Sequence, residues 1–121
     1  MNTQAGTRRQ SPRLNVPAMG RQADKAESLL KALASKPRLM ILCNLTTGEK
    51  SVGELLNEVE LSPSAMSQHL ALLREQGLVS TRRQAQTIFY SLEDGPALDI
   101  ISILYSTYCK PRRKRRSSIK S

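Results

Sequence analysis

The chain has 121 residues, a length that suits one compact domain with tails and leaves no room for a large cleft between two domains. Its 19 lysines and arginines outnumber 10 acidic residues, which gives a formal net charge of +9. No apolar run approaches the ~18 residues of a transmembrane helix, and the first twenty residues lack the apolar core of a signal peptide. We therefore expect a cytoplasmic protein with no membrane partner.

The positive charge is concentrated at the two ends of the chain. Residues 1–20 carry three arginines and no acid, and residues 110–121 carry seven basic residues and no acid, whereas residues 21–109 have a net charge of −1. We expect disordered basic arms at residues 1–19 and 110–121 around one folded domain of residues 20–109. Basic arms on a nearly neutral body favour attraction to phosphate, and solvated ends without a partner are the alternative.

Two helices are predicted in the first part of the domain. From about Arg21 to Ala34, alanines and leucines recur at steps of three and four residues, which is typical of an amphipathic helix. Ser35 then provides an N-cap and Pro37 is tolerated in a first helical turn, so a second helix is predicted from about 37 to 45. Gly48 is a natural stop for this helix.

A helix-turn-helix is predicted in the middle of the chain. Ser51 to Glu54 has the S-x-x-E spacing of a capping box, so a short helix should run to about residue 59. Ser62-Pro63 marks a second helix start after a tight turn, and that helix should end near Gln76, before Gly77. In such a motif the second helix enters the major groove of DNA.

Polar residues near the start of this second helix are the candidates for base contacts. Glutamine can bond adenine N6 and N7 together, and serine suits several bases. An ordinary polar solvent face is the alternative interpretation. The candidates are Ser62, Ser64, Ser67, Gln68 and His69.

Residues 78–81 and 88–92 predict two strands, because they are rich in Val, Thr, Ile, Phe and Tyr. Residues 82–86 should form the polar tip between them. Side chains at such a tip can contact phosphate or the minor groove. The candidates are Arg82, Arg83, Gln84 and Gln86.

A last helix should follow Asp94-Gly95-Pro96, where Asp94 is a candidate cap. Its apolar residues cover much of its circumference, so we expect one flank to pack on the domain and another on a partner chain. The predicted fold is thus mainly α with a β-hairpin wing, an α+β winged helix-turn-helix.

Residues 21–109, about three quarters of the chain, resemble the ArsR/SmtB family of bacterial winged-helix repressors. Four segments carry the resemblance: Leu33-Ala-Ser-Lys-Pro-Arg-Leu-Met-Ile-Leu42, Leu61-Ser-Pro-Ser-Ala-Met-Ser-Gln-His-Leu70, Leu72-Leu-Arg-Glu-Gln-Gly-Leu-Val79 and Ile88-Phe-Tyr-Ser-Leu92. Ala85 stands where family members usually carry Gly. The resemblance implies a bacterial homodimer formed by the first and last helices, a palindromic double-stranded DNA operator, and loss of DNA binding when an inducer engages.

Many members of this family sense metals, but the usual ligands are missing. The helix predicted at 51–59 lacks the C-x-C pair that arsenic and lead sensors place there, and the last helix contains Asp99 but no histidine. The only histidine of the chain is His69, and zinc needs about four ligands in close array. We therefore expect no metal site and no cofactor. A metal sensor that uses the two cysteines with an oxygen ligand is an alternative.

Cys43 and Cys109 are the only cysteines, and a reducing compartment disfavours a permanent disulfide between them. Two small buried hydrophobic residues are the simplest interpretation. The chain resembles the BigR- and SqrR-type repressors, however, which carry one cysteine in each of these two helices. That resemblance implies a redox switch driven by persulfide or another small oxidant. A thiolate attacks an electrophilic sulfur, and the neighbouring thiol resolves the adduct.

The sequence as a whole predicts a repressor whose operator binding is relieved by bridging of the two cysteines. A constitutive DNA-binding protein whose basic arms do most of the binding is a second hypothesis. An enzyme such as a thiol peroxidase is disfavoured, because the chain has no C-x-x-C, no second histidine and no glycine-rich phosphate loop.

Overall fold

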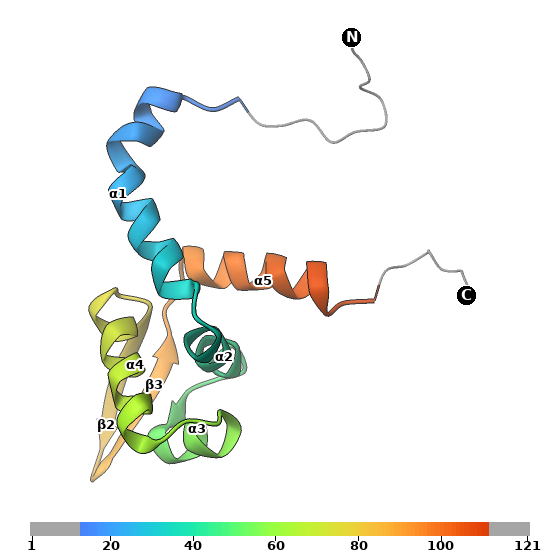
Figure 1. Cartoon of the computed structure of the whole chain (residues 1–121). Helices are drawn as coiled ribbons and strands as arrows, with labels where there is room; N and C mark the ends of the chain where they lie inside the picture. Colours follow the sequence, from blue (N-terminus) through green and yellow to red (C-terminus); the bar gives the residue numbers. More distant parts are fainter. Residues whose placement is uncertain (1–12, 112–121) are drawn as a thin grey trace.

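The computed structural model describes residues 13–111, so residues 1–12 of the predicted arm 1–19 and residues 112–121 of the predicted arm 110–121 lie outside the described part. The described elements form a winged helix-turn-helix, which confirms the predicted fold class (Figure 1). In chain order they are α1 (Val16–Leu33), α2 (Lys36–Leu45), β1 (Lys50–Ser51), α3 (Val52–Glu58), α4 (Pro63–Glu75), β2 (Val79–Gln84), β3 (Thr87–Leu92) and α5 (Pro96–Tyr108).

Helix α1 begins about one turn earlier than predicted, inside the stretch that was expected to be a disordered arm. The side chain of Asn15 caps the helix by accepting a hydrogen bond from the Ala18 amide at 3.0 Å, and Pro17 lies in the first turn. The predicted start near Arg21 was wrong because it relied on apolar periodicity. A cap followed by proline starts a helix without any packing contact.

The caps of three other helices were predicted correctly. Ser35 accepts from the Arg38 amide at 3.4 Å, and Ser62 accepts from the Ala65 amide at 3.1 Å. Both bonds of the capping box between Ser51 and Glu54 are present, at 2.8 and 3.1 Å. The prediction that Asp94 caps α5 was wrong. The N-cap residue is Gly95, one position later, so α5 begins without a side-chain cap.

The hydrophobic core lies where α2, α3 and α4 meet the sheet. The side chains with the least exposure come from these three helices, and each such leucine or isoleucine contributes about 1.5–3 kcal/mol by leaving water. Leu78 just before β2, Val79 of β2, and Ala97 and Ile101 of α5 complete the core. The fully buried large side chains are Ile41, Leu42, Leu55, Met66, Leu70 and Leu73.

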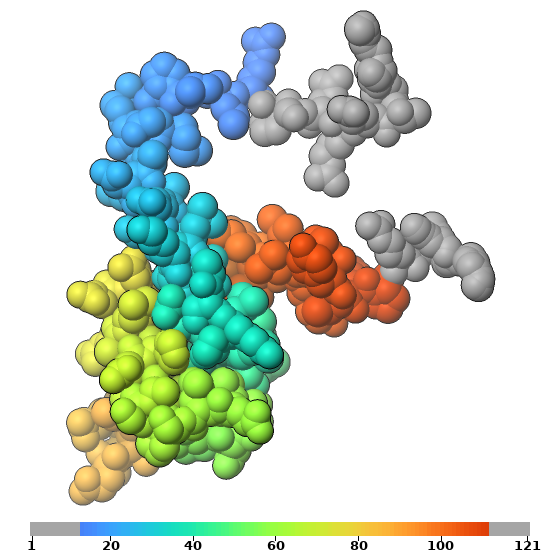
Figure 2. All heavy atoms as spheres, in the orientation of Figure 1, coloured from blue at the N-terminus to red at the C-terminus, as the bar shows by residue number. Residues whose placement is uncertain are grey.

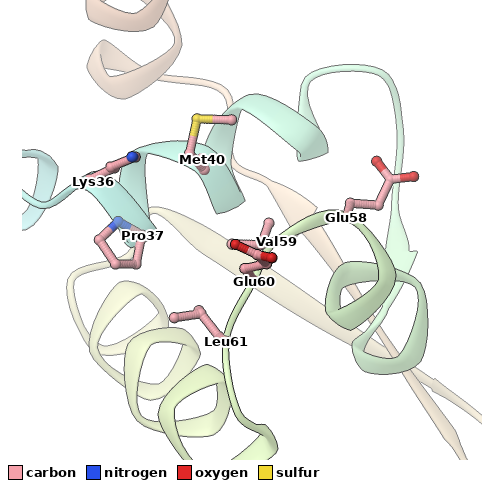
Figure 3. A pocket seen from close by; sticks show the side chains of 7 residues that line it. All are labelled: Lys36, Pro37, Met40, Glu58, Val59, Glu60 and Leu61. Carbon is pink, nitrogen blue, oxygen red and sulfur yellow. The ribbon is translucent and has the colours of Figure 1, made fainter.

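The first turn of α2 lies against the turn that joins α3 to α4. The two segments enclose an open hollow of about 500 Å³, shown in Figure 3. Its exposed rim carries Lys36, Glu58 and Glu60, so both charge signs are present. The apolar walls are Pro37, Met40, Val59 and Leu61. Helix α2 therefore packs directly against the helix-turn-helix.

The sheet is antiparallel with strand order β1-β3-β2, and the short strand β1 was not predicted. Strands β2 and β3 are longer than predicted, with Gln84 opposite Thr87, so the turn consists of Ala85 and Gln86 alone. The prediction that Arg82, Arg83 and Gln84 lie in the tip was wrong, because these residues continue strand β2. Their long polar side chains extend to solvent while their backbone stays paired with β3.

Helices α1 and α5 project from the body of the molecule (Figures 1 and 2). Each buries only one end, and each leaves large apolar side chains exposed along the rest of its length. On α1 these are Val16, Met19 and Leu30, and on α5 they are Ile103, Tyr105 and Tyr108. No helix of residues 13–111 is both long and apolar enough to cross a membrane.

Candidate nucleic-acid interface and cysteine pair

Helix α4 presents a polar face next to its buried one. Met66, Leu70 and Leu73 are buried in the core, which determines how the helix is rotated about its axis. Four of the five predicted base contacts are exposed on its N-terminal part as a consequence. They are Ser62, Ser64, Ser67 and Gln68.

The fifth predicted contact, His69, lies apart from these four. It is half-buried, and its ring nitrogen Nδ1 lies 3.3 Å from Nη1 of Arg38 in α2. The ring therefore faces the body of the protein. The sequence offered no sign of this partner, which is 31 positions away along the chain.

A hollow of about 440 Å³ lies between α4 and β3, beside the exposed serines. Ser67, Ala71 and Arg74 line it from α4 at helical spacings of four and three residues, the acidic Glu75 lines it beside Arg74, and Tyr90 lines it from β3. The prediction from sequence missed Arg74 and Tyr90. The i, i+4, i+7 spacing from Ser67 to Arg74 could have identified the arginine, because such residues share one face of a helix.

The two arginines of β2 point to opposite faces of the wing. Side chains alternate along a strand, and directly opposed residues of an antiparallel pair share a face. Thr81 is opposite Tyr90, so Arg83, two residues further, lies on the face that borders the hollow. Arg82 is opposite Phe89 and therefore lies on the other face.

The side chain of Arg82 is held on that other face by three neighbours. Its Nε and Nη2 donate to the two carboxylate oxygens of Glu49 at 3.2 and 2.5 Å, and its Nη1 donates to Oε1 of Gln84 at 2.8 Å. Its guanidinium carbon lies 4.7 Å from the centre of the Phe89 ring, a cation–π contact. The hydrogen bond from Arg82 lowers the pKa of Glu49 below its ordinary value, so this carboxylate stays ionised.

The turn of the wing is exposed and strained at one residue. Ala85 has φ 55°, in the left-handed region that favours glycine. A positive φ at the first central residue of a two-residue hairpin loop is typical of a type II′ turn. Gln86 is the one predicted tip contact that lies in this turn.

The two cysteines lie where α2 meets α5. Cys43 is partly buried, and Cys109 is exposed as the C-cap residue of α5, with its amide donating to the Tyr105 carbonyl at 2.8 Å. Burial raises the pKa of the Cys43 thiol, and the neighbouring Cys109 raises it further. Both thiols are free. The raised pKa lowers the thiolate fraction of Cys43 and with it the reactivity of this thiol as a nucleophile.

A cavity of about 570 Å³ opens between the same two helices. Its lining is mostly apolar, with one cation at its end. The lining residues are Cys43, Thr46, Leu98, Ile101, Ser102, Tyr105, Ser106 and Lys110. A small molecule can therefore reach the sulfur of Cys43 from solvent. Among residues 13–111, no three His, Cys, Asp or Glu side chains are grouped so that they could hold a metal ion.

Comparison with known proteins gives a consistent family. Residues 29–81 match the model described as bacterial regulatory protein, arsR family. The transcriptional activator HlyU of Vibrio cholerae is 50% identical over 97 residues, which cover 80% of this chain and 90% of that protein. The structure of reduced HlyU from Vibrio cholerae superposes with a TM-score of 0.72 over 77% of this chain and 98% of that chain. The transcriptional repressor BigR from Xylella fastidiosa is 38% identical, with a TM-score of 0.74 over 81% of this chain and 100% of that chain.

The family model covers the helix-turn-helix, the relatives match about four fifths of the chain, and together they confirm the resemblance drawn from the sequence. The relatives include an activator and a repressor of transcription. The chain belongs to the arsR family of bacterial regulatory proteins, and it is a DNA-binding transcriptional regulator and not an enzyme.

Proposed function

We propose that this regulator is a homodimeric repressor that binds a palindromic operator and releases it when Cys43 and Cys109 become bridged. The observation that supports the thiol switch best is the position of the two cysteines at the junction of α2 and α5. Helix α2 packs on the recognition helix α4, so a bridge at this junction acts on an element that supports DNA binding. A solved structure of HlyU is of its reduced form, and BigR is a transcriptional repressor, which supports a redox-dependent state and repression respectively.

The DNA-binding surface consists of the exposed start of α4, the hollow beside it and one face of the wing. Gln68 and Ser67 supply hydrogen bonds to base edges in the major groove. Arg74 lines the hollow, and Arg83 lies on the face of the sheet that carries Tyr90. Both bind phosphates, which positions the protein but carries no sequence information. Tyr90 forms the wall between them.

The dimer forms through the exposed apolar faces of α1 and α5. Tyr108 and Val16 are 79% and 69% exposed in one chain, although they are large and apolar, and a second copy removes such surface from water. A twofold dimer places two recognition helices one turn of DNA apart, which matches a palindrome with half-sites about 10 base pairs apart.

The inducer in this proposal is an organic persulfide, RS–SH. The Cys109 thiolate attacks the outer sulfur, the RS–SH bond breaks, and RS⁻ leaves with the former bonding pair, so that Cys109 carries –S–SH. Cys43 then attacks the Sγ of Cys109, which forms the Cys43–Cys109 disulfide and releases the outer sulfur with the Cys43 proton as hydrogen sulfide. The two thiols lose two electrons, and the persulfide gains them as RSH and H₂S.

Several features favour Cys109 as the attacking residue in this proposal. It is exposed, it is followed by the cation Lys110, and the raised pKa of Cys43 keeps that thiol protonated until it resolves the adduct. A plain disulfide requires Cα atoms within about 7 Å, and a bridge lengthened by additional sulfur spans a wider gap. A switch of this kind operates in a reducing compartment, where the disulfide does not persist.

The test of the switch uses an operator selected from random double-stranded DNA by the reduced wild type. Wild type, Cys43→Ser and Cys109→Ser are treated with a persulfide donor, and operator affinity and intact mass are measured. We expect wild type alone to lose affinity and to form the bridge. Release of DNA by either variant as by wild type would contradict a two-cysteine mechanism. Release by a metal salt in place of persulfide would support the metal-sensor alternative.

A second experiment tests the recognition helix. Replacing Ser67 and Gln68 with alanine should abolish sequence specificity and leave the dimer intact, because each lost base contact costs about 1–3 kcal/mol. Gln76→Ala, at the other end of the same helix, is the matched control and should bind as wild type does. Retained specificity in the double variant would contradict the assignment of Ser67 and Gln68 as base contacts, whereas a wild type without any sequence preference would favour the constitutive, non-specific DNA-binding alternative.

A further inference from the structure

We propose that Arg38 is a positioning residue that ties the end of α1 to the recognition helix and thereby determines the spacing of half-sites that the dimer accepts. Its guanidinium, in the first turn of α2, bonds two elements at once. Nε donates to the Ala32 carbonyl at 2.8 Å, Nη2 donates to the Lys31 carbonyl at 3.1 Å, and Nη1 lies 3.3 Å from Nδ1 of His69. Arg38 is half-buried, so these bonds are partly shielded from water.

The bonds to α1 complete the end of that helix. The last four carbonyls of a helix have no partner within it. In α1 the Leu30 carbonyl accepts from the Ala34 amide at 2.9 Å, and the Leu33 carbonyl accepts from the Ser35 amide at 2.8 Å. The two that remain are those of Lys31 and Ala32, and Arg38 bonds both. A positive charge is also favoured at this end of the helix dipole.

The bond to His69 has a defined direction. A guanidinium has donors and no acceptor, so Nδ1 of His69 accepts and the ring carries its hydrogen on Nε2. His69 lies between the exposed Gln68 and the buried Leu70. Holding this ring therefore restricts the rotation of α4 in the turn that presents Gln68.

The role is specific to arginine. One planar group reaches three acceptors in a fork, whereas the single nitrogen of a lysine at this position cannot match that geometry. Neither of the two ion pairs among residues 13–111 includes Arg38, so its charge is not used to neutralise a carboxylate. Its contacts are two carbonyls and one imidazole, which join three helices.

The consequence concerns the dimer, and here the inference rests on the proposed function, in which α1 contributes to the dimer interface. A link from the end of α1 to α4 fixes the recognition helix relative to the dimer axis. The distance between the two recognition helices then has one preferred value. Without the link, Met66 and Leu70 still hold α4 and the buried Ala32 and Leu33 still hold the end of α1, but the angle between the two helices is less restricted.

The experiment uses the full, reduced chain and a series of DNAs in which the half-site spacing of the selected operator changes by one base pair at a time. The variants are Arg38→Gln, His69→Ala, the two combined, and His69→Gln, whose side-chain oxygen can accept the same bond. Lys36→Gln is the control, because it removes one exposed positive charge from the same turn of α2. Dimerisation is measured by sedimentation and folding by thermal melting.

We expect Arg38→Gln and His69→Ala to lower affinity for the best spacing about tenfold or more, and to reduce the penalty for spacings one base pair away. The double variant should be no worse than Arg38→Gln alone, and His69→Gln should restore most of the preference. Lys36→Gln should keep the wild-type spacing profile. If Arg38→Gln fails to fold, His69→Ala, which removes only one of the three bonds, carries the same test.

Three results would overturn the inference: an unchanged spacing profile in folded, dimeric Arg38→Gln; losses that add in the double variant; or equal weakening at every spacing. A reduced wild type that shows no preferred spacing is a different result. It would refute the proposed binding of a palindromic operator by a dimer, and it would also refute the role of Arg38 in half-site spacing.

Discussion

Replacing Arg83 with glutamine should remove two phosphate contacts from the dimer, one per chain, whereas removing Arg82 together with Glu49 should remove none. The two arginines are neighbours in β2 and carry the same charge. They differ in that Arg83 lies on the face that borders the hollow beside α4, and Arg82 is bonded to Glu49 on the other face. Arg83→Gln is therefore compared with the neutral double replacement Glu49→Gln/Arg82→Gln.

The magnitude follows from counterion release. Each phosphate contact adds about 0.9 to the slope of log affinity against log salt, so one contact per protomer contributes about 1.8 in a dimer. Raising the salt from about 50 to about 200 mM is a change of about fourfold, and across it wild type should lose about tenfold more affinity than Arg83→Gln. The double replacement leaves the net charge unchanged and should keep the wild-type slope.

Fluorescence anisotropy with labelled operator at four or five salt concentrations measures these slopes. Arg82→Gln alone makes the net charge less positive by one and leaves the Glu49 carboxylate without its partner, so it should weaken attraction to DNA, and adding Glu49→Gln should restore it. If the double replacement lowers the slope as much as Arg83→Gln does, this result refutes the reasoning. Arg82 would then contact phosphate and would not be occupied by its ion pair with Glu49.

Three further predictions follow from single residues. Ala85→Gly should stabilise the protein by about 1 kcal/mol in urea unfolding, because glycine adopts the φ of 55° without steric strain; a loss of stability would contradict this. Iodoacetamide should alkylate Cys109 before Cys43 in the reduced protein, as peptide mass spectrometry would report, and equal rates would exclude the assigned attacker. The pKa of Glu49 is lowered in the folded state, so its ion pair stabilises the wing above the ordinary carboxyl range and is lost as pH falls through the folded pKa; the protection factors of the β2 amides, which correct for the pH dependence of intrinsic exchange, should fall there in wild type and not in Glu49→Gln.

The elements of the fold could be predicted from the sequence because their signals are local. A cap acts on amides two or three residues away, so Ser35, Ser51 and Ser62 marked helix starts whose bonds the structure contains. The apolar spacing of α4 likewise determined which side chains are buried and left Ser67 and Gln68 exposed. The same logic indicated the helix-turn-helix before any tertiary contact was known.

What the sequence could not determine depends on contacts between residues far apart in the chain. Glu49 and Arg82 are 33 positions apart, and Arg38 and His69 are 31, so no local spacing rule relates them. Strand register also depends on such distant contacts. Moving the wing turn by one residue would exchange the faces on which Arg82 and Arg83 lie. Only the packed sheet places Arg82 beside Glu49 and Arg83 on the opposite face, next to α4, and only the packed helices turn His69 away from its exposed neighbours towards Arg38.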